Sequence, residues 1–186
     1  MRSFFLFLSE AIKVVIISLA IIIPIRTFVI QPFYVKGASM EPNFYDHEYL
    51  IVDEISYRFK APKRGDIVVF RYPKNPQEYF IKRIIALPEE KIKIEDGEVY
   101  IFNNEFKEGF TLDESYLSES LKTYSISSEL VELSHDEYYV LGDNRNSSKD
   151  SRSFGPIDKS FIIGKVLFRG WPFDRINLFS EEEYQY

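Results

Sequence analysis

The sequence predicts a mainly β fold: a coiled antiparallel β-sheet core with one N-terminal transmembrane helix and a polar insertion. Three observations carry this prediction. An apolar segment lies near the N-terminus, short runs of β-branched and aromatic residues are bounded by turn residues, and one long stretch is rich in Ser and Glu. The 13 Tyr and 17 Phe favour strands. A chain of 186 residues suits one domain with an appendage.

The N-terminal segment predicts a single tilted transmembrane helix. Val14 to Ile25 is apolar apart from Ser18, but twelve helical residues cover only about 18 Å of a hydrocarbon core of about 30 Å. Extension to Ala11–Ile30 gives twenty residues, or about 30 Å. Lys13 and Arg26 then lie near the ends of the span, where long basic side chains reach the headgroups.

Two other interpretations of this segment stay open. A cleaved secretory signal needs a small-x-small cleavage site, and the residues from Arg26 to Pro32 offer none. A buried soluble helix needs an amphipathic pattern, whereas Ile21–Ile23 adds to an apolar surface all round the helix. Pro24 is expected to kink the last turns without forbidding a span. The few flanking charges leave the orientation of the span poorly determined.

The rest of the chain predicts a series of short strands. Gln31-Pro32 is expected to end the helix and to lead into an extended segment from Phe33 to Val35. Lys91–Ile101 alternates charged and apolar residues around Asp96-Gly97, which predicts a hairpin with Asp-Gly at its tip and one solvent-facing side. The other expected strands are Tyr49–Val52, Ile67–Tyr72, Glu78–Leu87, Tyr138–Leu141 and Phe161–Phe168.

The domain organisation follows from these elements. Residues 1–30 are expected to form a membrane anchor, and residues 31–102 and 138–178 to form the β core. Residues 103–137 are polar and weakly periodic, which predicts an insertion or lid outside the core. Residues 179–186 form an acidic tail.

Composition excludes several classes of function. A net charge of −6 gives no basic footprint for nucleic acid. The absence of cysteine excludes a Cys nucleophile, disulfides and thiolate metal sites. His47 and His135 both lie in polar turn-like contexts, so neither is expected to serve a Ser-His-Asp triad.

Ser39 and Lys82 are the two residues best suited to chemistry. Ser39 lies in a Gly-flanked loop and Lys82 lies in the apolar strand Phe80–Ile85. A lysine with a pKa near about 10.4 is protonated at neutral pH, but desolvation lowers the pKa by up to about 3–5 units. Strand alternation places Lys82 on the same face as Phe80 and Ile84. A serine beside such a lysine forms a nucleophile and general base, although each residue alone is more often an ordinary loop or edge residue.

A third element is the Gly-bounded loop 142–156, which follows a strand. Its Asp, Arg and hydroxyl residues are expected to form an ionic and hydrogen-bonded network able to orient a neighbouring amine. A plain polar turn and a cation-binding loop are the alternatives. Asp143, Asn144 and Asp150 lack EF-hand spacing and have Arg neighbours, so no metal or other cofactor is expected.

Taken together, four segments resemble the ordered boxes of the type I bacterial signal peptidases. These segments are Gly37–Pro42, Arg64–Phe70, Phe80–Pro88 and Gly142–Pro156. The resemblance runs from Arg26 to about Arg175. It implies a mainly β catalytic core and a single-pass Ser-Lys endopeptidase of the cytoplasmic (inner) membrane. The catalytic domain would lie on the extracytoplasmic side, next to the lipid bilayer, and remove signal peptides of the Ala-x-Ala type from exported preproteins.

Carried over residue by residue, the resemblance implies Ser39 as nucleophile and Lys82 as general base. It also implies that Ser148 holds the lysine amine and that the Ser39 backbone N–H is one oxyanion donor. The remaining supporting positions, whose ion pairs would brace the site, are Arg83, Asp143, Arg145, Asp150 and Arg152.

The chain departs from the family pattern at three places. Gly37 stands where some members have a serine as second oxyanion donor. The usual Gly-Leu-Pro-Gly-Asp is Ala86–Glu90, and the usual Thr-Leu is Asn43-Phe44. Two rival functions stay open: a self-cleaving Ser-Lys repressor, which would carry DNA-binding helices, and a non-enzymatic membrane-tethered β adaptor.

Overall fold

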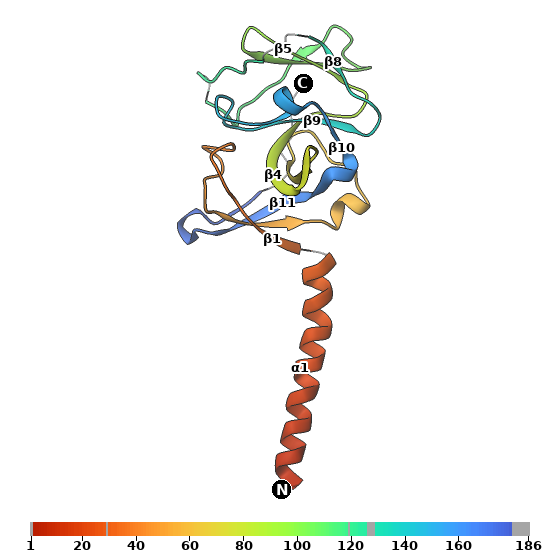
Figure 1. Ribbon diagram of the computed structural model, residues 1–186, viewed down its shortest axis with the longest axis vertical. Helices are drawn as coiled ribbons and strands as arrows, with labels where there is room; N and C mark the ends of the chain where they lie inside the picture. Colours follow the sequence, from red (N-terminus) through yellow and green to blue (C-terminus); the bar gives the residue numbers. More distant parts are fainter. Residues whose placement is uncertain (1, 29, 119, 126–128, 180–186) are drawn as a thin grey trace.

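A long N-terminal helix leads into a β domain in the computed structural model (Figure 1). The structure describes residues 2–28, 30–118, 120–125 and 129–179. Helix α1 spans Arg2–Phe28, and a short helix α2 spans Ser151–Phe154. Single 3₁₀ turns lie at η1 (Ser56–Arg58), η2 (Lys159–Phe161) and η3 (Phe173–Arg175). The mainly β fold class with an N-terminal apolar helix is therefore confirmed.

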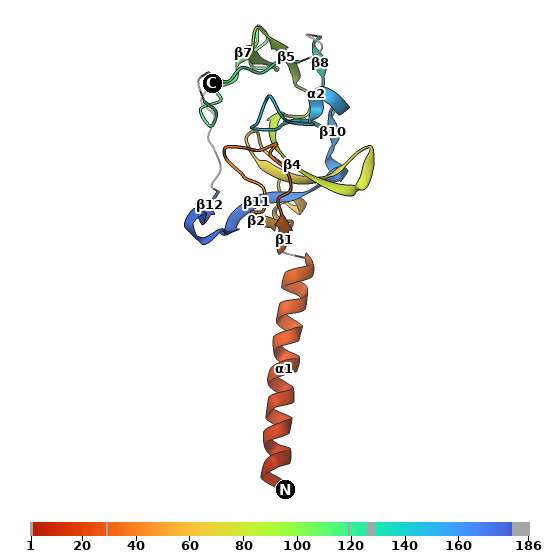
Figure 2. The same ribbon diagram turned by 60° about the vertical axis from the view of Figure 1, so that its left-hand side comes forward.

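Helix α1 is apolar and projects away from the β domain in both views (Figures 1 and 2). It begins nine residues before the predicted span and continues through Pro24. Its window Leu6–Ile23 has a mean hydropathy of 2.5 and is not buried against the rest of the molecule. This exposure excludes the buried soluble helix. Length and apolar composition suit a membrane span, but a signal sequence shares both features.

Most predicted strands are present with small shifts of their ends. The strands of the first part of the chain are β1 (Ile30–Tyr34), β2 (Tyr49–Asp53), β3 (Ile67–Tyr72), β4 (Asn75–Ala86), β5 (Lys91–Glu95) and β6 (Glu98–Phe102). The later strands are β7 (Phe110–Thr111), β8 (Val131–Glu132), β9 (Glu137–Leu141), β10 (Ile157–Asp158), β11 (Ile162–Trp171) and β12 (Asn177–Leu178). One boundary was wrong: Gln31 and Pro32 belong to β1 and pair with β2, which Pro tolerates because β1 is an edge strand.

The described residues form two antiparallel sheets. The larger has eight strands in the order β1-β2-β11-β3-β4-β9-β10, with β12 added beside β11. Register shifts interrupt β11 and β4, and such irregularities bend and twist a sheet. One apolar cluster around Phe44, Leu50 and Val52 lies on one side of this sheet. A second, around Phe70, Ile84 and Val140, lies on the other.

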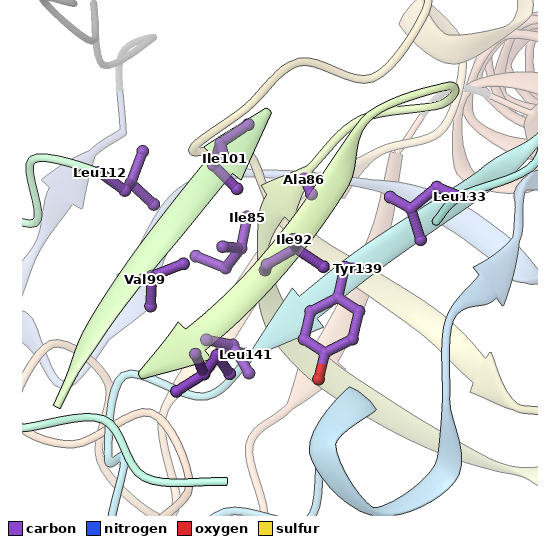
Figure 3. Packing of buried hydrophobic residues seen from close by; sticks show 10 residues of the cluster. Ile85, Ala86, Ile92, Val99, Ile101, Leu112, Leu133, Tyr139 and Leu141 are labelled. Atoms are coloured by element: carbon purple, nitrogen blue, oxygen red, sulfur yellow. The ribbon is translucent and has the colours of Figure 1, made fainter. Parts of the chain in front are cut away.

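The second sheet has the order β7-β6-β5-β8 in the described residues and lies at the end of the domain remote from α1 (Figures 1 and 2). Its hairpin turns at Asp96 (φ 53°) and Gly97 (φ 88°), the two positive φ values that a type I′ turn requires. The predicted Asp-Gly tip is therefore confirmed. The apolar side of the hairpin packs against Ile85 and Leu141 of the larger sheet (Figure 3).

The sequence predicts that the segment 103–137 is a polar element outside the core, but part of it is buried in the structure. It supplies β7 and β8, and its Leu112 and Leu133 are buried in the cluster of Figure 3. The strands were missed because each has only two residues, too short for a period-2 pattern. The division of the chain into domains stays a prediction, and the acidic tail beyond Phe179 lies outside the described residues.

Candidate active site

Ser39 lies in the loop between β1 and β2, which is folded back on itself. The N–H of Phe44 donates to Met40 O at 2.8 Å, and that of Glu41 donates to Ala38 O at 3.2 Å. Gly37 opens the loop at φ 92°, a left-handed conformation that favours glycine. Its N–H donates to Asp46 Oδ1 at 2.8 Å. A serine would be strained in this conformation.

Lys82 lies in the middle of β4, opposite Val68 on β3, and is 3% exposed. Its Nζ donates to Ser39 Oγ at 2.7 Å and to the carbonyl of Ile81 at 2.7 Å. Burial lowers the pKa of Lys82 to about 8, although the more distant charges of Asp150 and Asp143 act in the opposite direction. At pH 7 about a tenth of this amine is therefore neutral and able to accept a proton, far more than for a lysine with its ordinary pKa.

Arg83, the next residue, points to the opposite face of β4 and is 2% exposed. Its Nε and Nη2 donate to the two carboxylate oxygens of Asp143 at 2.9 and 2.8 Å. The guanidinium carbon also lies 3.8 Å from the ring centre of Tyr116. This bidentate pair joins β4 to the loop that follows β9.

The loop after β9 holds the Ser39 loop directly. Asn144 donates its backbone N–H to Ser39 O and its side-chain Nδ2 to Ala38 O, both at 3.0 Å. Gly142 makes this approach possible, because a Cβ there would collide with Ser148 Oγ and with the carbonyl of Ser39. The two loops are therefore packed backbone to backbone.

Two further ion pairs stabilise this loop. Arg145 contacts Glu114, Thr123 and the hydroxyl of Tyr116, and its Nε donates to Gly142 O at 3.0 Å. Asp150 accepts from Gly142 N at 3.0 Å and from Arg152 Nη2 at 2.7 Å. Burial alone would raise the pKa of Asp150, but its bonds to Arg152 and Gly142 hold the pKa below its usual value.

The structure thus brings together the residues predicted from the sequence, with one difference in detail. Ser148 Oγ is buried and faces Asp150, whose pKa it helps to lower, and within the described residues it makes no hydrogen bond to Lys82. The lysine amine is held by the Ile81 carbonyl in its place. The expectation that the Ser148 hydroxyl holds the amine rests on the family resemblance alone. The Lys82 amine instead bends back to the carbonyl of Ile81, the residue before it in β4.

Sequence reasoning missed several residues that contact this network, among them Asn43, Glu114, Tyr116, Thr123 and Asn144. Glu114 and Tyr116 lie in the segment that was predicted to be an insertion, so they were not considered for the site. Asn144 stands inside a recognised box, between Asp143 and Arg145, and Asn43 was noted only as a departure from the family pattern. Their polar type at a loop position was the available signal.

The altered turn Ala86–Glu90 keeps its structure by other means. Glu89 adopts φ 66°, the conformation that the family glycine would adopt without strain. Glu90 accepts from the N–H of Leu87 at 2.8 Å and from Arg64 Nη2 at 2.6 Å. The carboxylate of Glu90 therefore stabilises this turn and joins it to Arg64.

A groove of about 640 Å³ opens beside the two polar groups. It runs between the end of β1 and the first half of β4. Strand β9 pairs with β4 only at Arg83–Ala86, so the Asn75–Lys82 part of β4 has a free edge within the described residues. The groove is mainly apolar, and its lining residues are Phe33, Tyr34, Val35, Lys36, Ser39, Leu50, Val69, Glu78, Tyr79, Phe80, Ile81, Lys82 and Lys149.

A serine hydroxyl hydrogen-bonded to a buried amine at the wall of such a groove is an arrangement typical of serine hydrolases. Comparison with known proteins agrees. The profile of the family described as "Signal peptidase, peptidase S26" matches residues 8–171. A probable signal peptidase I-2 of Synechocystis sp. is 37% identical over 175 residues, which cover 91% of this chain and 76% of that protein.

A signal peptidase IB of Staphylococcus aureus is 33% identical over 177 residues, which cover 89% of this chain and 91% of that protein. A crystal structure of a signal peptidase I from Enterococcus faecalis is 30% identical and covers 57% of this chain and 97% of that one, with a TM-score of 0.47. The chain belongs to the signal peptidase family, peptidase S26, and is a serine endopeptidase.

Proposed function

We propose that this protein removes signal peptides from exported preproteins, with Ser39 as nucleophile and Lys82 as general base. One observation supports these roles above all others. The Lys82 amine lies 2.7 Å from Ser39 Oγ, and no carboxylate forms an ion pair with it within the described residues. A buried amine without a counter-charge has its neutral form favoured, as a base requires.

The proposed reaction proceeds through an acyl-enzyme. Neutral Lys82 takes the proton of Ser39 Oγ while the oxygen attacks the scissile carbonyl carbon. The backbone N–H of Ser39 donates to the developing oxyanion. The C–N bond then breaks, the lysine proton goes to the leaving amine, and the signal peptide stays esterified to Ser39. Water attacks the ester with Lys82 again as base, which releases the carboxylate and restores the serine.

The groove suggests how the substrate is held. An extended peptide that enters between β1 and β4 meets the free edge of each, so it can form main-chain hydrogen bonds as an added strand. Alternate side chains of such a strand point to the same side. The residues one and three positions before the cut would face the apolar wall near Val69 and Ile81. We therefore propose that the enzyme selects substrates with small residues at these two positions.

We also propose that α1 is a single-pass anchor in the cytoplasmic membrane, with the β domain on the extracytoplasmic side. Ser39 follows Phe28 by eleven residues, so the chain between them spans at most roughly 36 Å. Exposed aromatic side chains lie on neighbouring strands near the end of α1, where Tyr34 pairs with Tyr49 and Tyr49 pairs with Trp171. Tyr and Trp favour the membrane interface, so this surface is proposed to contact the lipid bilayer.

The decisive experiment uses the purified full chain in detergent with a preprotein whose signal ends in Ala-x-Ala. Cleavage followed by sequencing of the new N-terminus should locate the cut after the second Ala. Ser39→Ala should abolish cleavage, whereas Ser160→Ala, a change at an exposed serine of η2, should leave it unchanged. Full activity of Ser39→Ala would eliminate the proposed nucleophile. Binding of the preprotein without cleavage by the unaltered chain would favour the adaptor function.

A further inference from the structure

Asn43 lies four residues after Ser39 in the same loop and contacts two separate clusters of buried charge. Its side-chain Nδ2 donates to Asp143 Oδ2 at 2.8 Å and to the carbonyl of Tyr116 at 3.1 Å. Because both partners are oxygen acceptors, the amide nitrogen must point toward them. Asn43 is half-buried, and the groove-lining residues do not include it.

The first cluster is the Arg83–Asp143 pair. Arg83 occupies both carboxylate oxygens of Asp143 through Nε and Nη2. Asn43 is then a further donor to Oδ2. The amide therefore connects the Ser39 loop to the ion pair that is anchored on β4 by the neighbour of Lys82.

The second cluster lies on the other side of the loop. Glu48 is 1% exposed and pairs with Arg169 Nη1 at 3.1 Å and with Arg175 Nη1 at 2.7 Å. Arg169 Nη1 also donates to the carbonyl of Asn43 at 2.7 Å. The carbonyl and the amide of one residue thus tie the loop to β11 and to the loop after β9.

We propose that Asn43 is a positioning residue for the reaction, one that fixes Ser39 Oγ against Lys82 Nζ. The segment between them is a compact turn closed by the bonds Phe44 N to Met40 O and Glu41 N to Ala38 O. Displacement of Asn43 is therefore transmitted to Ser39. A shift of about 1 Å in a reacting group costs on the order of 10²-fold in rate. This inference rests on the proposed nucleophile.

Two substitutions test the role. Asn43→Ala removes the amide, and Asn43→Asp keeps its shape but places a carboxylate against Asp143. Both should lower kcat about ten- to hundred-fold, because the geometry of the reacting pair is lost. KM should stay within about two-fold, because the groove is untouched. Asn43→Asp should be at least as impaired as Asn43→Ala, which a role in filling space alone would not produce.

Asn103→Ala is the matched control. Asn103 also donates from Nδ2 to a carboxylate, that of Glu90 at 3.2 Å, but it lies directly after β6 of the second sheet. It should lose thermal stability with kcat unchanged. Cleavage by Asn43→Asp within about two-fold of the unaltered chain would overturn the proposal, as would unfolding of both Asn43 variants while Asn103→Ala stays folded. If the unaltered chain fails to cleave, or if Ser39→Ala cleaves normally, the proposed function is wrong, and the role proposed for Asn43 is then wrong as well.

Discussion

Lys82 and Arg83 are neighbours in sequence, yet they meet opposite environments on the two faces of β4. Both are cationic residue types and both are almost completely buried, at 3% and 2% exposure. The guanidinium of Arg83 donates hydrogen bonds to both carboxylate oxygens of Asp143. Among the residues that the structure describes, Lys82 Nζ forms hydrogen bonds only with a hydroxyl and a carbonyl oxygen.

The difference teaches how one strand supports both structure and chemistry. A buried cation with a bidentate carboxylate keeps its charge, and loss of either partner is costly. A buried amine without such a partner releases its proton more readily. Burial without a carboxylate partner therefore costs stability at Lys82, but it also lowers the pKa so that the amine can act as a base near neutral pH.

The largest effect is expected from Lys82→Met, which keeps the length of the side chain but removes the amine. Cleavage should fall by about 10²–10⁴-fold, the usual contribution of a general base. The free energy of unfolding should stay equal or increase, because an incompletely solvated amine is replaced by an apolar chain. Steady-state cleavage and chemical denaturation measure the two effects.

Lys165→Met is the matched comparison, since Lys165 lies in the same sheet but pairs with Asp66 at 2.6 Å. It should lose stability while it retains cleavage. A Lys82→Met variant that unfolds more easily than Lys165→Met would contradict the contrast between a lysine without a carboxylate partner and a lysine paired with one.

Arg83→Met should be the most destabilising change on the structural face of β4. It leaves Asp143 buried with its charge uncompensated, which costs about 3–5 kcal/mol in the free energy of unfolding. Arg71→Met, at an exposed arginine of β3, should change stability by less than about 0.5 kcal/mol. Urea unfolding of both variants checks this. Adding Asp143→Asn to Arg83→Met should recover part of the loss, and strictly additive losses would argue against direct coupling.

Stability should also depend on pH through Lys82. Burial lowers the pKa of Lys82 from 10.5 to about 8, so between these values the unfolded chain holds a proton that the folded chain has released. The free energy of unfolding should therefore rise with pH across that window, by roughly 3 kcal/mol. Below about pH 8 the burial of the charged Lys82 amine should destabilise the folded chain by this full amount. Lys82→Met should lack this component. Parallel stability curves for the two proteins from pH 7 to about 10.5 would refute it.

The smallest effect is expected from Asp150→Asn. In the unaltered enzyme, kcat/KM should fall about tenfold per pH unit below the Lys82 pKa of about 8, because only the neutral amine accepts a proton. The charge of Asp150 raises that pKa. Its removal should move the acidic limb of the pH–rate profile to lower pH by a fraction of a unit. An unchanged limb in a folded variant would show that Asp150 has no electrostatic influence on the base.

The sequence predicted the local parts of this arrangement well. The strands of the larger sheet and the Asp-Gly hairpin follow from apolar periodicity and turn chemistry, which act over a few residues. The placement of Lys82 among apolar neighbours followed from strand alternation. Their local contexts suggested Ser39 and Lys82 as a pair, and the family resemblance assigned their roles, but no local rule brings together two residues that are 43 positions apart.

Other features could not be predicted for physical reasons. Strands β7 and β8 are held by pairing with β6 and β5 rather than by their own pattern. The polar segment 103–137 contains the buried Thr123 and the half-buried Glu114, which its pattern does not reveal because their partner Arg145 comes later in the chain. The left-handed Glu89 is sustained by the surrounding turn and its bonds through Glu90.

The short stretch of chain between helix α1 and the groove beside Ser39 has a kinetic consequence. Strand β1 starts two residues after α1 ends and forms one wall of the groove. In the proposed membrane arrangement, enzyme and preprotein are both confined to the plane of one bilayer. Their encounter is then a two-dimensional search at a raised effective concentration. A groove with weak intrinsic affinity for short peptides in solution can therefore still process its tethered substrates efficiently.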